Sequence, residues 1–96
     1  MKEFVLFDRI LFKDFKVDKI QEIVIPSSDI IRITERRFKE NVELSAEAEL
    51  EKNIKDKIEN ASGFSEVELE VKYNSTVWYE RYAVLGKPSD IYKQML

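Results

Sequence analysis

The chain has 96 residues and contains neither cysteine nor histidine, which excludes disulfide bonds, thiol nucleophiles, the Ser-His-Asp arrangement and the commonest zinc ligands. A hydrophobic fraction of 44% is sufficient for a packed core, and a charged fraction of 36% indicates a densely charged surface. Because two halves of so short a chain would each be too small to bury a core, we expect one domain over residues 1–96. The abundance of Glu, Lys and Ile is also typical of thermophile proteins.

The net charge of −3 is unevenly distributed along the chain. Residues 40–70 carry three Lys and Arg against ten Asp and Glu, whereas the segments before and after them each have a small excess of basic residues. We interpret the acidic region as a solubilising face. A docking surface for a basic partner is the alternative that stays open.

Two strands are expected at the beginning of the chain. Residues 3–12 are open to a helical interpretation, because four apolar positions have helical spacing: Phe4, Phe7, Leu11 and Phe15. The aromatic and β-branched content favours a strand instead. Residues 15–25 then form a β-rich run, which the turn formers of residues 26–29 close.

Residues 30–44 begin with the alternation of a half-buried strand. They predict either one long strand or a hairpin bent near Asn41. In both cases Arg32, Arg36 and Phe38 share one side of the strand, because side chains alternate with a period of two residues.

An amphipathic helix is predicted over residues 46–61. Ser45 is a favourable N-cap, and Gly63 suits the left-handed residue that ends a helix. Four positions form one apolar stripe on this helix: Leu50, Ile54, Ile58 and Ala61. We expect the stripe to be buried against a sheet that the helix covers.

A β-hairpin and a short helix complete the predicted fold. Residues 64–73 alternate strictly between apolar and charged side chains, Asn74 and Ser75 form the turn, and residues 76–85 return as the partner strand. Residues 91–96 are expected to form a short C-terminal helix, with Pro88 near its start. The prediction is therefore an α+β domain with an antiparallel sheet, in the order β-β-β-α-β-β followed by that helix.

The residue types argue against catalysis and against a bound cofactor. Metal binding would depend on carboxylates alone, and Glu66, Glu68 and Glu70 project side by side from one strand without a closing loop. The two glycines are too far apart to form a phosphate-binding loop. We therefore expect a protein that is not an enzyme and has no metal site.

The strand 76–85 carries the leading functional prediction, because large apolar side chains occur on both of its faces. One face can pack under a helix, but the other needs a further partner. We predict a protein-interaction module that forms a homo-oligomer, such as a dimer, or that docks to another protein. The predicted contact residues are Trp78, Tyr79, Tyr82 and Leu85.

A basic cluster supports the alternative function, a small nucleic-acid-binding regulator. The cluster consists of Arg32, Arg36, Arg37 and Lys39. Such residues can contact phosphates, although pairing with neighbouring acidic side chains is the simpler interpretation. No apolar stretch has the length of a membrane span and no signal-peptide pattern is present, so we expect a cytoplasmic protein without a membrane partner.

Overall fold

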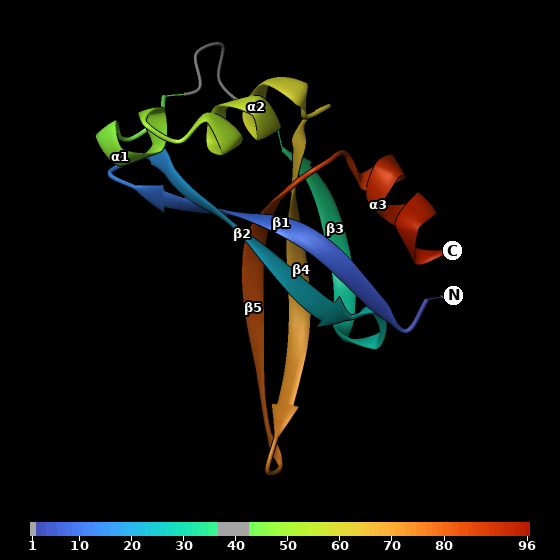
Figure 1. The fold of residues 1–96 in the computed structure, drawn as a ribbon. Coiled ribbons are helices and arrows are strands. Elements are labelled where there is room, and N and C mark those ends of the chain that lie inside the picture. The colour runs from blue at the N-terminus through green and yellow to red at the C-terminus, as the bar shows by residue number, and fades with distance from the viewer. Residues whose placement is uncertain (1, 37–42) are drawn as a thin grey trace.

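The computed structural model describes residues 2–36 and 43–96. Their backbone forms an antiparallel sheet of five strands, in the order β2-β1-β5-β4-β3, together with three helices (Figure 1). The strands are β1 (Phe4–Lys13), β2 (Lys16–Pro26), β3 (Ile30–Arg36), β4 (Phe64–Tyr73) and β5 (Thr76–Leu85). The helices are α1 (Ala46–Glu49), α2 (Lys52–Asn60) and α3 (Pro88–Met95), and a 3₁₀ turn η1 (Ser27–Asp29) follows β2. The predicted α+β class and antiparallel sheet are confirmed.

The N-terminal stretch forms strands and not a helix. β1 pairs with β2 along its whole length, and Asp14 and Phe15 turn the chain with positive φ angles of 52° and 65°. Val5 and Phe7 point to one side of β1 and are buried, while Leu6 between them is exposed. This alternation explains why the aromatic and branched residues of the stretch form a strand.

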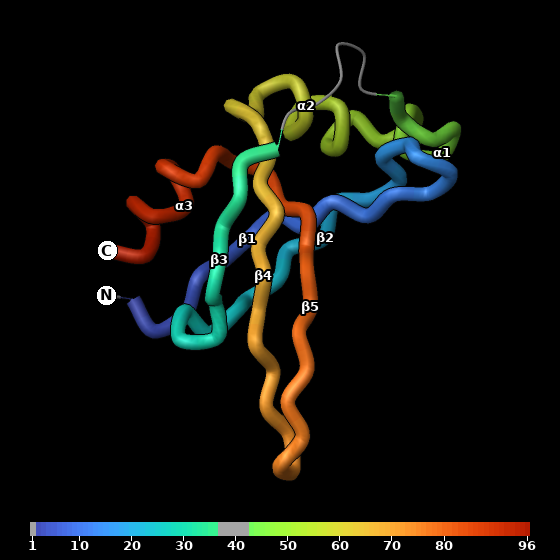
Figure 2. The backbone as a smooth tube through the Cα atoms, turned by 180° about the vertical axis from the view of Figure 1, so that it is seen from behind, coloured from blue at the N-terminus to red at the C-terminus, as the bar shows by residue number. Residues whose placement is uncertain are grey.

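The sheet bends at the crossing of β1 and β5, where Arg9 pairs with Val84 (Figure 2). The β1–β2 hairpin thereby packs over one face of the β3–β4–β5 sheet, which we call the inner face. The core lies between these two parts of the sheet and contains residues from both: Val5, Phe7, Ile25, Val67, Leu69 and Val84. The sheet therefore buries much of its own inner face.

The helix α3 supplies the remaining part of the core through Ile91, which is buried in the same cluster. Pro88 occupies the first turn of α3, as predicted, because a proline there loses no hydrogen bond that the helix needs. The Lys2 amide donates to the Met95 carbonyl at 2.8 Å, so the end of α3 is tied to the beginning of the chain.

The predicted single helix over residues 46–61 is wrong in its length and in its packing. The chain forms α1 and α2 with a break at Leu50 and Glu51, and the Leu50 side chain is 89% exposed. Ile54 and Ile58 are half-buried, and no residue of α2 is fully buried. The reason is that β1, β2 and α3 already cover the inner face of the sheet, so the apolar stripe has no free sheet surface to cover.

The beginning of the helical region is as predicted, with Ser45 as the N-cap of α1. Its Oγ accepts from the Ala48 amide at 3.1 Å and donates to Asp18 at 2.7 Å. The Ser45 amide also donates to the Val17 carbonyl at 2.8 Å. These bonds attach α1 to β2. Ala48, which is not part of the predicted apolar stripe, is the buried residue of α1.

The strand predicted within residues 30–44 is confirmed as β3 over its first part. A bend near Asn41 and the position of Phe38 lie outside the described residues. Leu44 is described, and it forms an isolated parallel bridge with Val17 of β2. It therefore does not extend the ladder between β3 and β4.

Candidate interaction site

The β4–β5 hairpin projects beyond the rest of the molecule (Figures 1 and 2). Its two strands pair without a register shift from Phe64 and Leu85 to the turn at Asn74 and Ser75, whose φ angles are 46° and 67°. β3 pairs with β4 no further than Leu69. Residues 70–79, which we call the hairpin tip, therefore extend past β3.

The hairpin tip exposes aromatic and aliphatic side chains on both faces. Tyr73 is 66% exposed and Trp78 is 37% exposed, and both are on the inner face of the sheet. Val77 and Tyr79 are on the opposite face, which we call the outer face, and Tyr79 is 61% exposed. Val71, on the inner face of the tip, packs against the core, whereas Tyr73 and Trp78 do not belong to that cluster.

On the inner face, hydrogen bonds connect three side chains of β5 where the hairpin tip begins. The Tyr82 hydroxyl donates to the Glu80 carboxylate, and Trp78 Nε1 donates to the same carboxylate at 3.2 Å. The hydrogen bond from Tyr82, followed by the one from Trp78, lowers the pKa of Glu80 below its ordinary value of 4.5. The same bond with Glu80 raises the pKa of Tyr82, and desolvation of its ring adds to this rise.

The structure exposes two of the predicted interface residues and partly buries the other two. Trp78 and Tyr79 are both exposed in the hairpin tip, Trp78 on the inner face and Tyr79 on the outer face. Tyr82 is half-buried beneath the guanidinium group of Arg9. Leu85 is at the far end of β5, half-buried opposite Phe64, and therefore away from the tip.

The sequence-based prediction did not include Tyr73 and Val77, although both are exposed in the hairpin tip. Tyr73 is the last residue of the alternating run 64–73, so its pattern suggested burial with Val67 and Leu69. A residue next to a two-residue turn lies farthest from the body of a sheet, and this position is the signal that could have marked it as exposed.

The outer face of the sheet carries alternating charges that pair across strands. Arg32 of β3 is opposite Glu68 of β4, which in turn is opposite Arg81 of β5. Glu66 forms ion pairs with Arg36 at 3.4 Å and with Arg81 at 3.8 Å. Such exposed pairs contribute little stability, but they lower the net positive potential at the arginines.

The predicted nucleic-acid site is described only in part. Arg32 and Arg36 are exposed on β3, whereas Arg37 and Lys39 lie outside the described residues. Aromatic side chains of β5 could stack with bases. Trp78 and Tyr82 are on the inner face, on the other side of the sheet from Arg32, whereas Tyr79 is on the outer face with Arg32. Nucleic-acid binding through this cluster stays a prediction.

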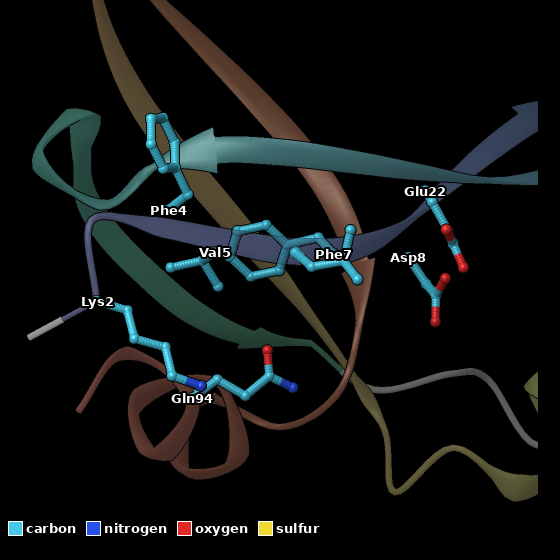
Figure 3. Close-up of a pocket in the computed structure, with 8 residues that line it drawn as sticks. Lys2, Phe4, Val5, Phe7, Asp8, Glu22 and Gln94 are labelled. Atoms are coloured by element: carbon cyan, nitrogen blue, oxygen red, sulfur yellow. The ribbon is translucent and has the colours of Figure 1, made fainter.

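A shallow pocket of about 370 Å³ lies beside β1 and is lined in part by Lys2, Asp8, Glu22 and Gln94 (Figure 3). Asp8 and Glu22 are at the opposite end of the pocket from Lys2 and Gln94. Asp8 forms an ion pair with Lys57 at 3.1 Å.

Acidic side chains do not converge on a cation site within residues 2–36 and 43–96, where no three of them could hold a metal ion together. Glu66, Glu68 and Glu70 lie along the outer face of β4, and Glu66 and Glu70 form ion pairs with basic side chains. None of the described helices has the length and apolar character that a membrane span requires.

Comparison with known proteins gives no relative. No family model matches the chain, and no curated protein or solved structure is significantly similar to it.

Proposed function

We propose that this protein is a non-enzymatic interaction module that assembles with copies of itself through the hairpin tip. The observation that carries the proposal is the exposure of aromatic residues on both faces of a projecting hairpin: Tyr73, Trp78 and Tyr79. Interface centres are enriched in Trp and Tyr, and a few such residues typically carry most of the association energy. The proposal includes a cytoplasmic location.

The charge distribution favours a second copy as the partner. The hairpin tip contains Glu70 and Lys72, and Glu80 and Arg81 follow it on β5, so acidic and basic residues balance here, whereas the whole chain has a net charge of −3. The segment 46–60, from α1 through α2, has five acidic residues against three lysines, and it lies at the opposite end of the molecule from the turn of the hairpin (Figure 1). Contact through the tips therefore brings neutral segments together and keeps the acidic ends apart.

A closed assembly also explains how a charged protein tolerates these side chains. Exposed aromatic groups at the end of a hairpin promote uncontrolled association unless a defined partner covers them. A two-fold dimer is the commonest arrangement that covers identical patches on two copies and leaves none free. We therefore propose a dimer.

Sedimentation velocity tests the proposal over protein concentrations from about 1 µM to about 1 mM, which covers weak and moderately stable interfaces. We expect the mass to rise from that of a monomer towards that of a dimer and then to stop. A monomer throughout this range would refute self-assembly. Growth without a limit would refute the closed dimer.

A further inference from the structure

The strand β5 has a free edge along the hairpin tip. β4 pairs with all ten residues of β5, but on the other edge β1 pairs with β5 at Val84 alone. In the part of the chain that the structure describes, the edge from Thr76 to Tyr82 therefore has no neighbouring strand. Figure 2 shows the lower part of β5 with β4 on one side and no strand on the other.

The part of this edge next to the turn lacks the usual protection against pairing. Proteins block edge strands with charged residues, prolines or bulges. The other two edges of the sheet carry charges along their length, on β2 at Lys16, Asp18, Lys19 and Glu22 and on β3 at Arg32, Glu35 and Arg36. The segment Thr76–Tyr79 of β5 has no charge and no proline, and its ladder with β4 has no bulge.

The hairpin turn determines which residues offer backbone groups to this edge. In a two-residue hairpin the residues on either side of the turn, here Tyr73 and Thr76, form a hydrogen-bonded pair. Along the ladder such pairs alternate with non-hydrogen-bonded pairs, whose amide and carbonyl groups point away from the partner strand. The odd-numbered residues of β5 therefore direct their amide and carbonyl groups away from β4. Val77, Tyr79 and Arg81 present these groups at the free edge.

We infer that a second copy of the chain pairs with β5 edge to edge, antiparallel and about a two-fold axis, with Tyr79 opposite Tyr79 of the second copy. This inference rests on the proposed function and specifies its contact. In such a pair the two-fold axis is perpendicular to the sheet and passes through the centre of the shared ladder. One residue must therefore lie opposite the same residue of the second copy. Tyr79 is the middle residue of the free edge Thr76–Tyr82, and this register uses the whole edge.

Neighbouring registers are less favourable for electrostatic and geometric reasons. A centre at Glu80 or Arg81 places like charges directly opposite each other, which destabilises a strand pair. A centre nearer the turn shortens the ladder. With Tyr79 at the centre, Val77 is opposite Arg81 of the second copy, and both direct their backbone groups to the shared edge.

Cysteine cross-linking tests this register, because the natural chain contains no cysteine. In the inferred pair the two positions 79 have Cα atoms about 5.5 Å apart, within the range of about 4.4–6.8 Å that a disulfide requires. Two positions 77, or two positions 81, are separated by about 13 Å along the strand direction, since each residue adds about 3.3 Å. Tyr79→Cys should therefore cross-link at least about tenfold faster than Val77→Cys or Arg81→Cys under a mild oxidant.

The double variant Val77→Cys/Arg81→Cys keeps the test decisive if loss of the Tyr79 side chain weakens the dimer. Positions 77 and 81 of different copies are opposite each other in the inferred register, so this variant should also cross-link rapidly. If the natural protein dimerises but neither variant links faster than the single controls, the inferred pairing is overturned and the proposed function stands. If the natural protein stays monomeric, both are overturned.

Discussion

The guanidinium carbon of Arg9 lies 4.0 Å from the centroid of the Tyr82 ring, at the place where β1 crosses β5. Arg9 is also the residue that pairs with Val84 in the short ladder between these strands. The cation–π contact therefore supports a junction that has little backbone pairing. It also holds the Tyr82 ring where its hydroxyl can donate to Glu80.

Replacing Arg9 by Gln should destabilise the fold by about 0.5–2 kcal/mol, the range for cation–π contacts from exposed to desolvated sites. Urea unfolding measures this change, and a double-mutant cycle with Tyr82→Leu isolates the coupling between the two side chains. The exposed Arg32→Gln is the matched control and should cost less than about 0.5 kcal/mol. Equal effects of the two arginine variants would show that the ring contact is unimportant.

The two helical isoleucines should respond differently to truncation. Ile91 of α3 is buried in the core, so Ile91→Ala should cost about 2–5 kcal/mol. Ile54 of α2 is half-buried outside that cluster, so Ile54→Ala should cost clearly less. Chemical unfolding of both variants provides the comparison. A larger loss for Ile54→Ala would mean that α2 and not α3 covers the core.

Acid should weaken the fold partly through Glu80. Its pKa is lowered in the folded protein, chiefly by the Tyr82 hydrogen bond, so its ionised form contributes stability above the ordinary value of 4.5. This contribution is lost as the pH falls through the lowered folded value. Glu80→Gln removes the titrating group, so we expect its unfolding free energy to fall less steeply than that of the natural protein below about pH 4.5.

High pH should also weaken the fold, partly through Tyr82. Its pKa is raised in the folded protein by the bond with Glu80, so its protonated form contributes stability below the ordinary value of 10.0. That contribution disappears as the pH rises through the raised folded value. A spectrophotometric titration of tyrosine in Glu80→Gln should show Tyr82 ionising at lower pH than in the natural protein. Identical titrations would contradict the role of the hydrogen bond.

A charge in the hairpin tip should prevent self-assembly without unfolding the subunit. Tyr79→Glu places a carboxylate at the centre of the proposed contact, and the residue is exposed in the monomer. We expect at least about a tenfold weaker dimer, the effect of losing about 1.4 kcal/mol of binding energy. Tyr92→Glu on α3 is the control, since Tyr92 is 52% exposed and α3 lies away from the turn of the hairpin (Figure 1). Sedimentation measures the dimer affinity of both variants, and circular dichroism checks that both remain folded.

The pairing of Arg36 with Glu66 leads us to expect little binding of nucleic acid. A gel-shift assay with single-stranded and double-stranded DNA and RNA at low salt should show no retardation. Salt-dependent retardation that Arg32→Ala/Arg36→Ala weakens for all sequences would instead support the regulator alternative, because phosphate contacts behave in this way.

The sequence by itself determined the elements whose signals are local. The alternation of residues 64–73, the turn at Asn74 and Ser75 and the return strand 76–85 were predicted with the bounds that the structure has. The Ser45 cap and the position of Pro88 near the start of α3 were also predicted correctly, although α3 begins earlier than the predicted residues 91–96. Each of these features depends on side-chain periodicity or on backbone preferences within a few residues of the chain.

Tertiary structure alone decided which surfaces are covered. Val5, Phe7 and Ile25 pack over β4 and β5 from a distant part of the sequence, and with Ile91 they take the place expected for the stripe of residues 46–61. The same packing ends before the hairpin tip, so Trp78 is exposed there although Val84, on the same face of β5, is buried. The periodicity of a strand shows that two residues share a face, but burial of that face depends on segments far away in sequence, whose positions local patterns do not specify.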